Sequence, residues 1–428
     1  MVAKDTTGVT RSAQIRIIES SDRRSIEPVL HSHIAADQEF ERRVQRLVAR
    51  VRRDGDRALV EFARRFDGVS PPLELSAGEI RAGAARAGRD VRRALEQAAV
   101  HIARVARYQL PQRWKRTIAP GVVVEQRLEP LARVGCYVPG GRFPLPSSLL
   151  MTAVPARVAG VGEIVVACPR PEPPVLAAAV QAGVTRLFRI GGAHAVAALA
   201  YGTATVPRVD KIVGPGNRYV AAAKALVARD CAIDFYAGPT EIAIVAGAGR
   251  AGWIAADLAA QAEHDPDARA LFITWNRRLA RRVAAAIAIN TADRPIAARA
   301  LATHGAIIVT RSASEAIELA NRIAPEHLVL EREALAKRPL TAGSIFIGPM
   351  TAQAAGDYAI GSNHVLPTAG AARFRGGLSA ADFVRVTSVQ RLTRAGLARL
   401  APTIVTLARA EGLEAHAESI NVRLPGFV

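Results

Sequence analysis

The segment QAEHDPD, residues 261–267, carries side chains that could bind a metal ion. It ends a long alanine-rich run that predicts a helix, and a proline follows two residues after the histidine. Gln261 and His264 are three residues apart, so on a helix they share a face and could reach one ligand. Taken alone, this spacing leaves two interpretations open, a solvated helix end and half of a metal site.

Three more histidines stand close to acidic residues in segments bounded by turns. The segments are IAPEHLVLE, AAGDYAIGSNHVLPT and ARAEGLEAHAES, and the pairs in them are Glu326–His327, Asp357–His364 and Glu411–His416. Each pair alone is compatible with an ordinary polar contact or a helix cap. Because the chain has only nine histidines, their shared placement beside carboxylates predicts acid/base or metal chemistry.

A glycine-rich turn at residues 247–252 has the spacing G-x-G-x-x-G, after the strand-like EIAIVA and before a helical segment. This context is typical of a dinucleotide-binding fingerprint. The acidic residue expected after the next strand is missing, because ALFITW runs into Asn276 and two arginines. We therefore interpret the segment as a plain turn that needs glycine for steric reasons.

The elements that must position these residues are typical of an α/β protein. Residues 35–66 and 78–109 have a helical pattern, and from about residue 122 short β-branched runs alternate with alanine-rich stretches. Such alternation predicts βαβ units and parallel sheets. The runs before and after residue 240 form two series, so we expect two sheets. From Leu378 onward we expect helix again, in an appended tail.

The composition limits the class of protein. A chain of 428 residues is long for one core, and its net charge of +19 raises the alternative of a basic nucleic-acid-binding protein. The arginines are scattered along helices, with no basic block among aromatic residues, so we expect a solvated surface and no nucleic-acid partner. The three cysteines lie in apolar runs, and no signal peptide or membrane span is visible, so we expect a cytoplasmic protein with reduced thiols.

Several long motifs in the same order resemble the histidinol dehydrogenase family. They include GCYVPGG, VDKIVGPGNRYVAAAK, AGPTEI, QAEHDPDA, APEHL, AGDYAIGSNHVLPT and GLSAADFVRVTSVQRL, between about residues 35 and 424. The resemblance implies two incomplete Rossmann-like parallel-sheet domains, two small extra domains and an intertwined homodimer. We expect an N-terminal helical segment at 1–120, α/β domains at 121–240 and 241–377, and a tail domain reaching the partner subunit at 378–428.

The resemblance also implies a zinc- and NAD-dependent enzyme that oxidises L-histidinol through the aldehyde to L-histidine with two NAD. It assigns zinc to Gln261, His264, Asp357 and His416, and the acid/base roles to Glu326 and His327. The implied substrate contacts are Thr240, Gln261, His264, His327, Asp357, His364, Glu411 and His416. The implied NAD contacts are Tyr137, His194 and Asn217.

Two positions depart from the family pattern. Thr240 stands where serine is usual, which keeps the hydroxyl, and His194 stands where glutamine is common, which puts its contact with NAD in doubt. A related dehydrogenase of the same fold, acting on another polar alcohol such as a sulfonated propanediol, is the alternative within the fold. The presence of Glu411 and of GLSAADF favours histidinol.

Overall fold

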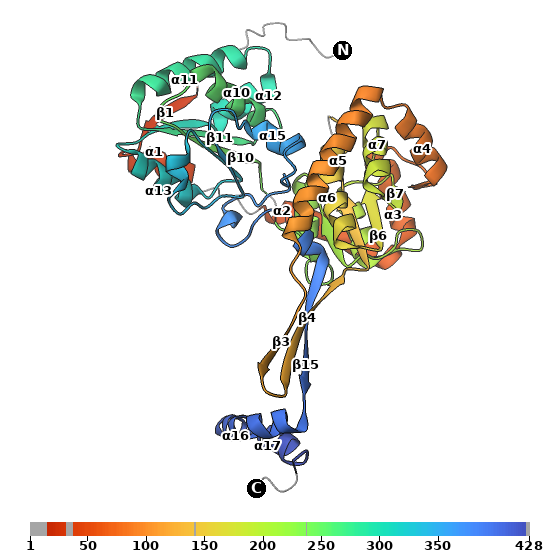
Figure 1. Ribbon diagram of the computed structural model, residues 1–428. Helices are drawn as coiled ribbons and strands as arrows, with labels where there is room; N and C mark the ends of the chain where they lie inside the picture. The colour runs from red at the N-terminus through yellow and green to blue at the C-terminus, as the bar shows by residue number, and fades with distance from the viewer. Residues whose placement is uncertain (1–14, 31–36, 141–142, 237, 425–428) are drawn as a thin grey trace.

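The computed structural model describes residues 15–30, 37–140, 143–236 and 238–424. Two α/β bodies lie beside one another, and a narrow three-stranded arm extends away from them to a pair of C-terminal helices (Figure 1). The predicted fold class, mixed α/β with two mainly parallel sheets, is confirmed.

The sheet of the first body has the order β2-β7-β6-β5-β8-β9. Its strands are parallel except β2, which runs antiparallel to β7. The strands are β2 (Glu74–Leu75), β5 (Arg133–Tyr137), β6 (Glu163–Ala167), β7 (Arg186–Phe188), β8 (Lys211–Val213) and β9 (Ala232–Ile233).

Helices cover both faces of this sheet, because successive apolar side chains of a strand point to opposite sides. Val166 packs in one core cluster and its neighbour Val165 in the other. The first cluster includes α4 (Ala77–Ala85), α5 (Arg89–Gln109), α6 (Pro146–Ala159) and α7 (Pro173–Ala182). The second includes α2 (Gln38–Asp54), α3 (Asp56–Phe62), the π-helical turn η1 (Ala63–Asp67), α8 (Gly192–Tyr201) and α9 (Arg218–Val227).

The sheet of the second body is parallel throughout, with the order β1-β12-β11-β10-β13-β14. Its strands are β1 (Arg16–Glu19), β10 (Glu241–Val245), β11 (Arg269–Thr274), β12 (Ala306–Val309), β13 (His327–Leu330) and β14 (Ser344–Ile347). One face packs against α10 (Ala251–Ala262), α11 (Arg277–Asn290) and α12 (Pro295–Thr303), and the other against α1 (Arg23–Leu30) and α13 (Ala313–Ile323). The short helices α14 (Glu333–Ala336) and α15 (Gln353–Tyr358) follow β13 and β14.

Each sheet has one place where the strand order reverses. In the first sheet β6 and β7 extend from one side of β5 and β8 lies on the other; in the second, β11 and β12 extend from one side of β10 and β13 lies on the other. In open α/β sheets, ligands bind in the crevice at the carboxyl ends of the strands at such a reversal. The pairs β5–β8 and β10–β13 are therefore the two places to look for a nucleotide.

The arm is antiparallel and consists of β3 (Trp114–Ala119), β4 (Val122–Pro130) and β15 (Val384–Leu392), in the order β15-β4-β3. After β15 the chain forms α16 (Arg394–Ala410) and α17 (Glu414–Asn421) at the tip of the arm (Figure 1). The expectation of helix from Leu378 onward was wrong for β15, because Val384, Val386 and Val389 give this segment a β-branched character.

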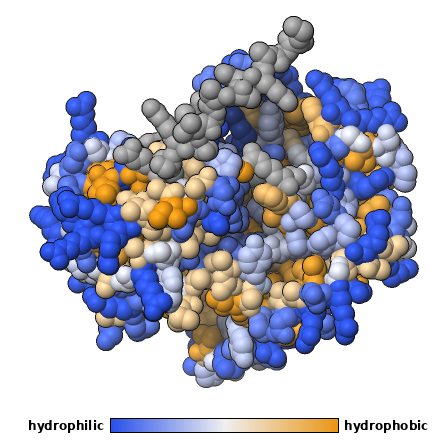
Figure 2. Space-filling model, turned by 90° about the horizontal axis from the view of Figure 1, so that it is seen from above, coloured by the Kyte–Doolittle hydropathy of each residue, from blue (hydrophilic) through white to orange (hydrophobic). Residues whose placement is uncertain are grey.

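The proposed domain boundaries at residues 120, 240 and 377 stay a prediction. The strand β1, near the start of the described chain, belongs to the second sheet, where it pairs with β12. The three cysteines are buried and free, as expected. Hydrophilic side chains cover the outer sides of both bodies in Figure 2, as expected for a solvated surface. Among the described residues, no helix is long and apolar enough to cross a membrane.

Candidate active site

The predicted acid/base residues meet at the amino edge of the second sheet. Glu326 directly precedes β13, His327 is its first residue, and Thr240 directly precedes the neighbouring strand β10. The parallel register pairs His327 with Ile242. Segments far apart in the sequence therefore place a carboxyl, an imidazole and a hydroxyl together.

The Glu326 carboxylate is buried and held by two donors. Its Oε2 accepts from the Thr240 hydroxyl and, at 2.8 Å, from the backbone N–H of Glu241. Burial nevertheless raises the pKa of Glu326 to about 8, although both hydrogen bonds act to lower it. A carboxyl with this pKa can take up and release a proton near neutral pH, as a general base must.

The backbone beside Glu326 sets the tautomer of His327. Nδ1 of His327 lies 3.1 Å from the carbonyl oxygen of Glu241, which can only accept, so Nδ1 carries the proton and donates. The lone pair is then on Nε2, which lies 3.8 Å from Oδ1 of Asp357. Burial lowers the pKa of His327, which favours the neutral, basic ring.

Gln261 supplies an acceptor that the protein leaves unused. Its amide nitrogen donates to the Thr240 hydroxyl, whereas its Oε1 is buried and has no hydrogen-bond partner. A buried carbonyl oxygen without a hydrogen-bond partner lowers the stability of the folded protein, unless a bound ligand supplies the missing partner. This unpaired oxygen is suited to the expected role of Gln261 as a zinc ligand, because zinc is coordinated by oxygen as well as by imidazole nitrogen.

Asp357, in α15, is the second residue that fits a zinc ligand. Burial raises the pKa of its carboxyl, while nearby His327 and His264 act to lower it, which places the His264 ring in the same locality. The helices α10 and α15, which carry Gln261 and Asp357, are in contact. Within the described residues, however, no three His, Cys, Asp or Glu side chains form a group that could hold a metal ion.

His364 connects this site to the first body. Its Nδ1 donates to the backbone carbonyl of Asp357 at 2.9 Å, and its Nε2 lies 3.4 Å from the Ser148 hydroxyl in α6. Asn363, next to it, donates to the backbone carbonyl of Met151 in the same helix. Burial lowers the pKa of His364 to about 4, so the ring is neutral. The site therefore lies where the 357–364 segment meets the first body.

Two of the predicted site residues lie elsewhere in the chain. Glu411 is the C-cap residue that follows α16, His416 lies in α17, and both side chains are exposed. These helices are at the tip of the arm, away from the bodies (Figure 1). Within one chain, the structure does not bring them to Gln261 and His264.

The residues expected to contact NAD gather at the carboxyl edge of the first sheet. Tyr137 ends β5, and Asn217 caps α9 just beyond β8, so they flank the strand-order reversal. The Asn217 oxygen accepts from the N–H groups of Tyr219 and Val220, which leaves its amide nitrogen for a ligand. The Tyr137 hydroxyl accepts from the N–H of Gly192 at 3.0 Å.

His194 also lies at this edge but is already engaged. The ring is buried, its Nε2 is 2.8 Å from Oδ2 of Asp67, and the rings of Phe62 and Phe66 lie close by. The other partner of Asp67 is the N–H of Gly191, at 3.0 Å. His194 and Asp67 together hold the turn before α8, so a direct contact between His194 and NAD stays a prediction.

The glycine-rich turn at 247–252 lies at the other strand-order reversal and is closed. Oε2 of Glu331, just beyond β13, accepts from the N–H groups of Gly247 and Ala248 at 2.8 and 2.6 Å. These are the donors that a pyrophosphate would need. A Cβ at Gly247 would lie 2.2 Å from the Trp275 ring, so the glycine is required for packing. Both observations agree with the interpretation as a plain turn.

Sequence reasoning missed Gln353, which contacts two of the predicted site residues. It is buried at the start of α15, and its amide nitrogen lies 2.7 Å from Oδ2 of Asp357 and 3.2 Å from Nε2 of His327. The carboxylate can only accept, so the group facing it is the amide N–H. Its position one helical turn before Asp357 was the signal that could have revealed it.

Two sheets with strand-order reversals, and a buried carboxyl and imidazole near an unpaired amide oxygen, are the features expected of an α/β dehydrogenase. The sequence model of the family described as "Histidinol dehydrogenase" matches residues 31–424. The chain belongs to the histidinol dehydrogenase family. Members of this family are oxidoreductases that use NAD and zinc.

Individual members of the family align with this chain over nearly its whole length. The chain is 48% identical to a histidinol dehydrogenase of Geobacter metallireducens over 403 residues, which cover 91% of this chain and 92% of the relative. It is also 48% identical to one of Cereibacter sphaeroides over 392 residues, covering 88% and 90%. The crystal structure of histidinol dehydrogenase from Elizabethkingia anophelis superposes with a TM-score of 0.92 at 30% identity, covering 97% of this chain and 99% of that one.

Proposed function

We propose that this chain oxidises L-histidinol to L-histidine in two steps at the amino edge of the second sheet, with two NAD. The observation that carries this assignment is the chain of contacts from Gln261 through Thr240 to Glu326, with His327 alongside. It joins an orphaned oxygen suited to zinc with two groups suited to proton transfer.

We assign the first oxidation to His327. Its Nε2 lone pair takes the proton of the substrate hydroxyl as the carbinol carbon gives up a hydride, which leaves the aldehyde. When bound, zinc would act as a Lewis acid toward the substrate oxygen, and NAD would accept the hydride. The Glu241 carbonyl keeps the proton on Nδ1, so the lone pair is on Nε2, where the substrate hydroxyl takes the place of the Gln353 N–H that faces it at 3.2 Å.

We assign the second oxidation to Glu326. The ionised carboxylate takes a proton from water as the water oxygen adds to the aldehyde carbon, and the protonated carboxyl then returns that proton to the new alkoxide, which gives a gem-diol. Loss of a second hydride and a proton from the gem-diol gives the carboxylic acid. The Thr240 hydroxyl and the Glu241 N–H orient the carboxylate for this transfer.

We assign zinc to Gln261, His264 and Asp357 of one chain together with His416 of a second copy. The arm supports this proposal, since it holds His416 and Glu411 exposed and away from their own bodies (Figure 1). Apolar side chains on the same tip are also exposed to solvent, among them Leu407 and Val422 at 58% and 61%. A homodimer in which each tail covers the partner's site would bury this surface and complete the ligand set.

We propose that substrate contacts come from both chains as well. Glu411 from the tail would accept from a cationic group of histidinol, and His364 and Thr240 would line the site from the body. NAD would occupy the crevice between β5 and β8, contacting Tyr137 and Asn217, with His194 beside them. We place the enzyme in the cytoplasm, an assignment that the three free, buried thiols support.

The test counts NADH formed per L-histidinol consumed by the purified protein. We expect two NADH, no activity after removal of metal with a strong chelator, and recovery when zinc is added. One NADH with accumulation of an aldehyde would contradict the second step. Full activity of the metal-free protein would contradict a role for zinc.

A further inference from the structure

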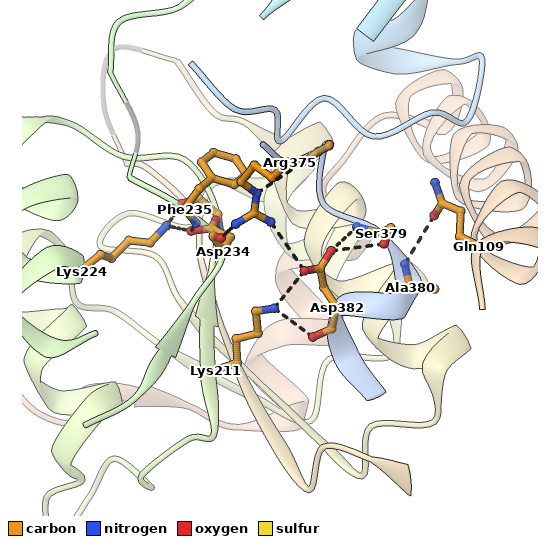
Figure 3. A network of polar contacts seen from close by, with 11 residues as sticks. Gln109, Lys211, Lys224, Asp234, Phe235, Arg375, Ser379, Ala380 and Asp382 are labelled. Atoms are coloured by element: carbon orange, nitrogen blue, oxygen red, sulfur yellow. Dashed lines mark hydrogen bonds and ion pairs between the residues drawn. The ribbon is translucent and has the colours of Figure 1, made fainter. Parts of the chain in front are cut away.

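A buried ion pair lies under the turn that follows β8. Lys224 in α9 and Asp234 just beyond β9 are in direct contact, and their side chains are 3% and 0% exposed (Figure 3). A buried pair of charges is a weak source of stability, since desolvation offsets the attraction. Its presence here calls for an explanation from the groups that it contacts.

Both members of the pair also hold Gly214, the first residue of the turn GPGN. Oδ2 of Asp234 accepts from the N–H of Gly214 at 2.8 Å, and Nζ of Lys224 donates to the carbonyl oxygen of Gly214 at 3.1 Å. Both backbone polar groups of one residue are thus fixed by charged partners. Charge-assisted hydrogen bonds of this kind are stronger and shorter than neutral ones.

No residue other than glycine fits at position 214 in this conformation. The φ of Gly214 is +116°, and a Cβ would lie 2.2 Å from the carbonyl oxygen of Tyr137. The turn is therefore pressed against the end of β5. The close contact with the Tyr137 carbonyl sets how near the turn lies to β5. The hydrogen bonds from Lys224 and to Asp234 set the orientation of the Gly214 backbone.

We propose that Lys224 and Asp234 are positioning residues for the dinucleotide: they hold the 214–217 turn in the binding conformation before NAD arrives. This inference rests on the proposed function, which places NAD between Tyr137 and Asn217. Ordering a loop on binding costs affinity, and a turn that is already ordered avoids the cost. Neither residue touches the nucleotide; both act through Gly214.

The same network extends to the root of the arm and supplies a matched control. Arg375 donates to the backbone carbonyl of Asp234, and its guanidinium lies 3.6 Å from Oδ1 of Asp382 (Figure 3). Lys211 donates to Oδ1 and to the backbone carbonyl of Asp382, at 3.1 and 3.0 Å. This second Lys–Asp pair resembles the first but makes no contact with Gly214.

The test measures the Kd of NAD, by calorimetry or protein fluorescence, in variants that remove the charges in pairs. Lys224→Met with Asp234→Asn avoids an unpaired buried charge and keeps an acceptor for the Gly214 N–H. Lys224→Met with Asp234→Val removes both tethers. We expect the Kd to rise about tenfold in the first double variant, roughly the loss of one charge-assisted hydrogen bond, and further in the second. Lys211→Met with Asp382→Asn removes a pair that shares Arg375 with Asp234 but makes no hydrogen bond to Gly214, and it should leave the Kd within about twofold of wild type.

A wild-type Kd in folded double variants would show that the pair only supports the fold, and would overturn the proposal. Asn217→Ala in the same assay tests the proposed NAD site separately. If NAD does not bind beside Asn217, the Kd of Asn217→Ala will also equal that of wild type; if only the positioning role is wrong, the Kd of Asn217→Ala will rise. Hydrogen exchange in the wild-type dimer needs no variant. We expect the Gly214 amide to exchange slowly without NAD, and exchange as fast as in an exposed loop would equally overturn the proposal.

Discussion

Gln353 and Asp357 stand one turn apart in α15, and the amide nitrogen of the first donates to Oδ2 of the second at 2.7 Å. The same nitrogen faces Nε2 of His327 at 3.2 Å. One neutral side chain thus orients both a proposed zinc ligand and the proposed base. Groups that orient a metal ligand in this way contribute measurably to metal affinity.

We expect Gln353→Met to weaken zinc binding by about 10- to 100-fold. Methionine keeps most of the volume, so the change removes the donor while the buried packing is retained. The measurement is competition for zinc with a chromophoric chelator, with the melting temperature recorded to verify folding. Zinc affinity equal to that of wild type would show that Asp357 needs no such support.

Glu326→Gln should slow aldehyde oxidation by about 100- to 10,000-fold and affect alcohol oxidation much less. The carboxylate is the active form of the base, so the wild-type rate of the aldehyde step should rise as pH passes through the pKa of about 8. That rise should be absent in the variant. Rates measured separately with histidinol and histidinaldehyde would show equal losses if Glu326 had another role.

Glu411→Gln should lower kcat/KM for histidinol by about ten- to a hundredfold, the loss of one charge-assisted hydrogen bond of about 1.5–3 kcal/mol. Glu414→Gln is the matched control. It removes the same charge three residues along the chain from Glu411, and the Glu414 side chain is exposed and pairs with Arg409. Its kcat/KM should stay near that of wild type. Equal effects of the two changes would point to the overall charge of the tail and not to a contact made by Glu411.

Co-expression of His264→Asn with His416→Asn tests whether the site is shared between chains. In a shared arrangement, one site of each mixed dimer combines an intact body with an intact tail, while the other carries both defects. Mixed dimers should therefore recover up to about half of the wild-type activity, although each variant alone is inactive. Differential tags isolate the mixed dimers, and their complete inactivity would place both histidines in a site within one chain.

Much of the second sheet could be predicted from the sequence because its strands are short β-branched runs between alanine-rich helices. The segments around Ile244, Phe272 and Ile308 are strands, and their burial follows the pattern. The arm was harder to predict, because β15 pairs with β4, more than 250 residues earlier in the chain. Local propensity carries no information about such a distant partner.

The candidate site was predictable in its residue types and not in its supporting contacts. Gln261 and Glu326 stand out as polar side chains in otherwise apolar segments, but the Thr240 hydroxyl that joins them becomes visible only when β10 and β13 are side by side. The Asp67–His194 pair likewise joins residues 127 positions apart. Contacts of this kind form only in the folded chain, so the periodicity of apolar residues in the sequence does not predict them.

The carboxylate of Glu331 occupies the N–H groups at 247–248, and this has a consequence for the order of events during turnover. Of the two strand-order reversals in the described sheets, it leaves the one between β5 and β8 for a dinucleotide. Both hydride transfers would then use one nucleotide position in succession. Spent cofactor would have to depart and fresh cofactor arrive while the half-oxidised aldehyde stays bound. The proposed site at the amino edge of the second sheet would therefore retain a reactive intermediate through an interval in which the crevice between β5 and β8 is empty.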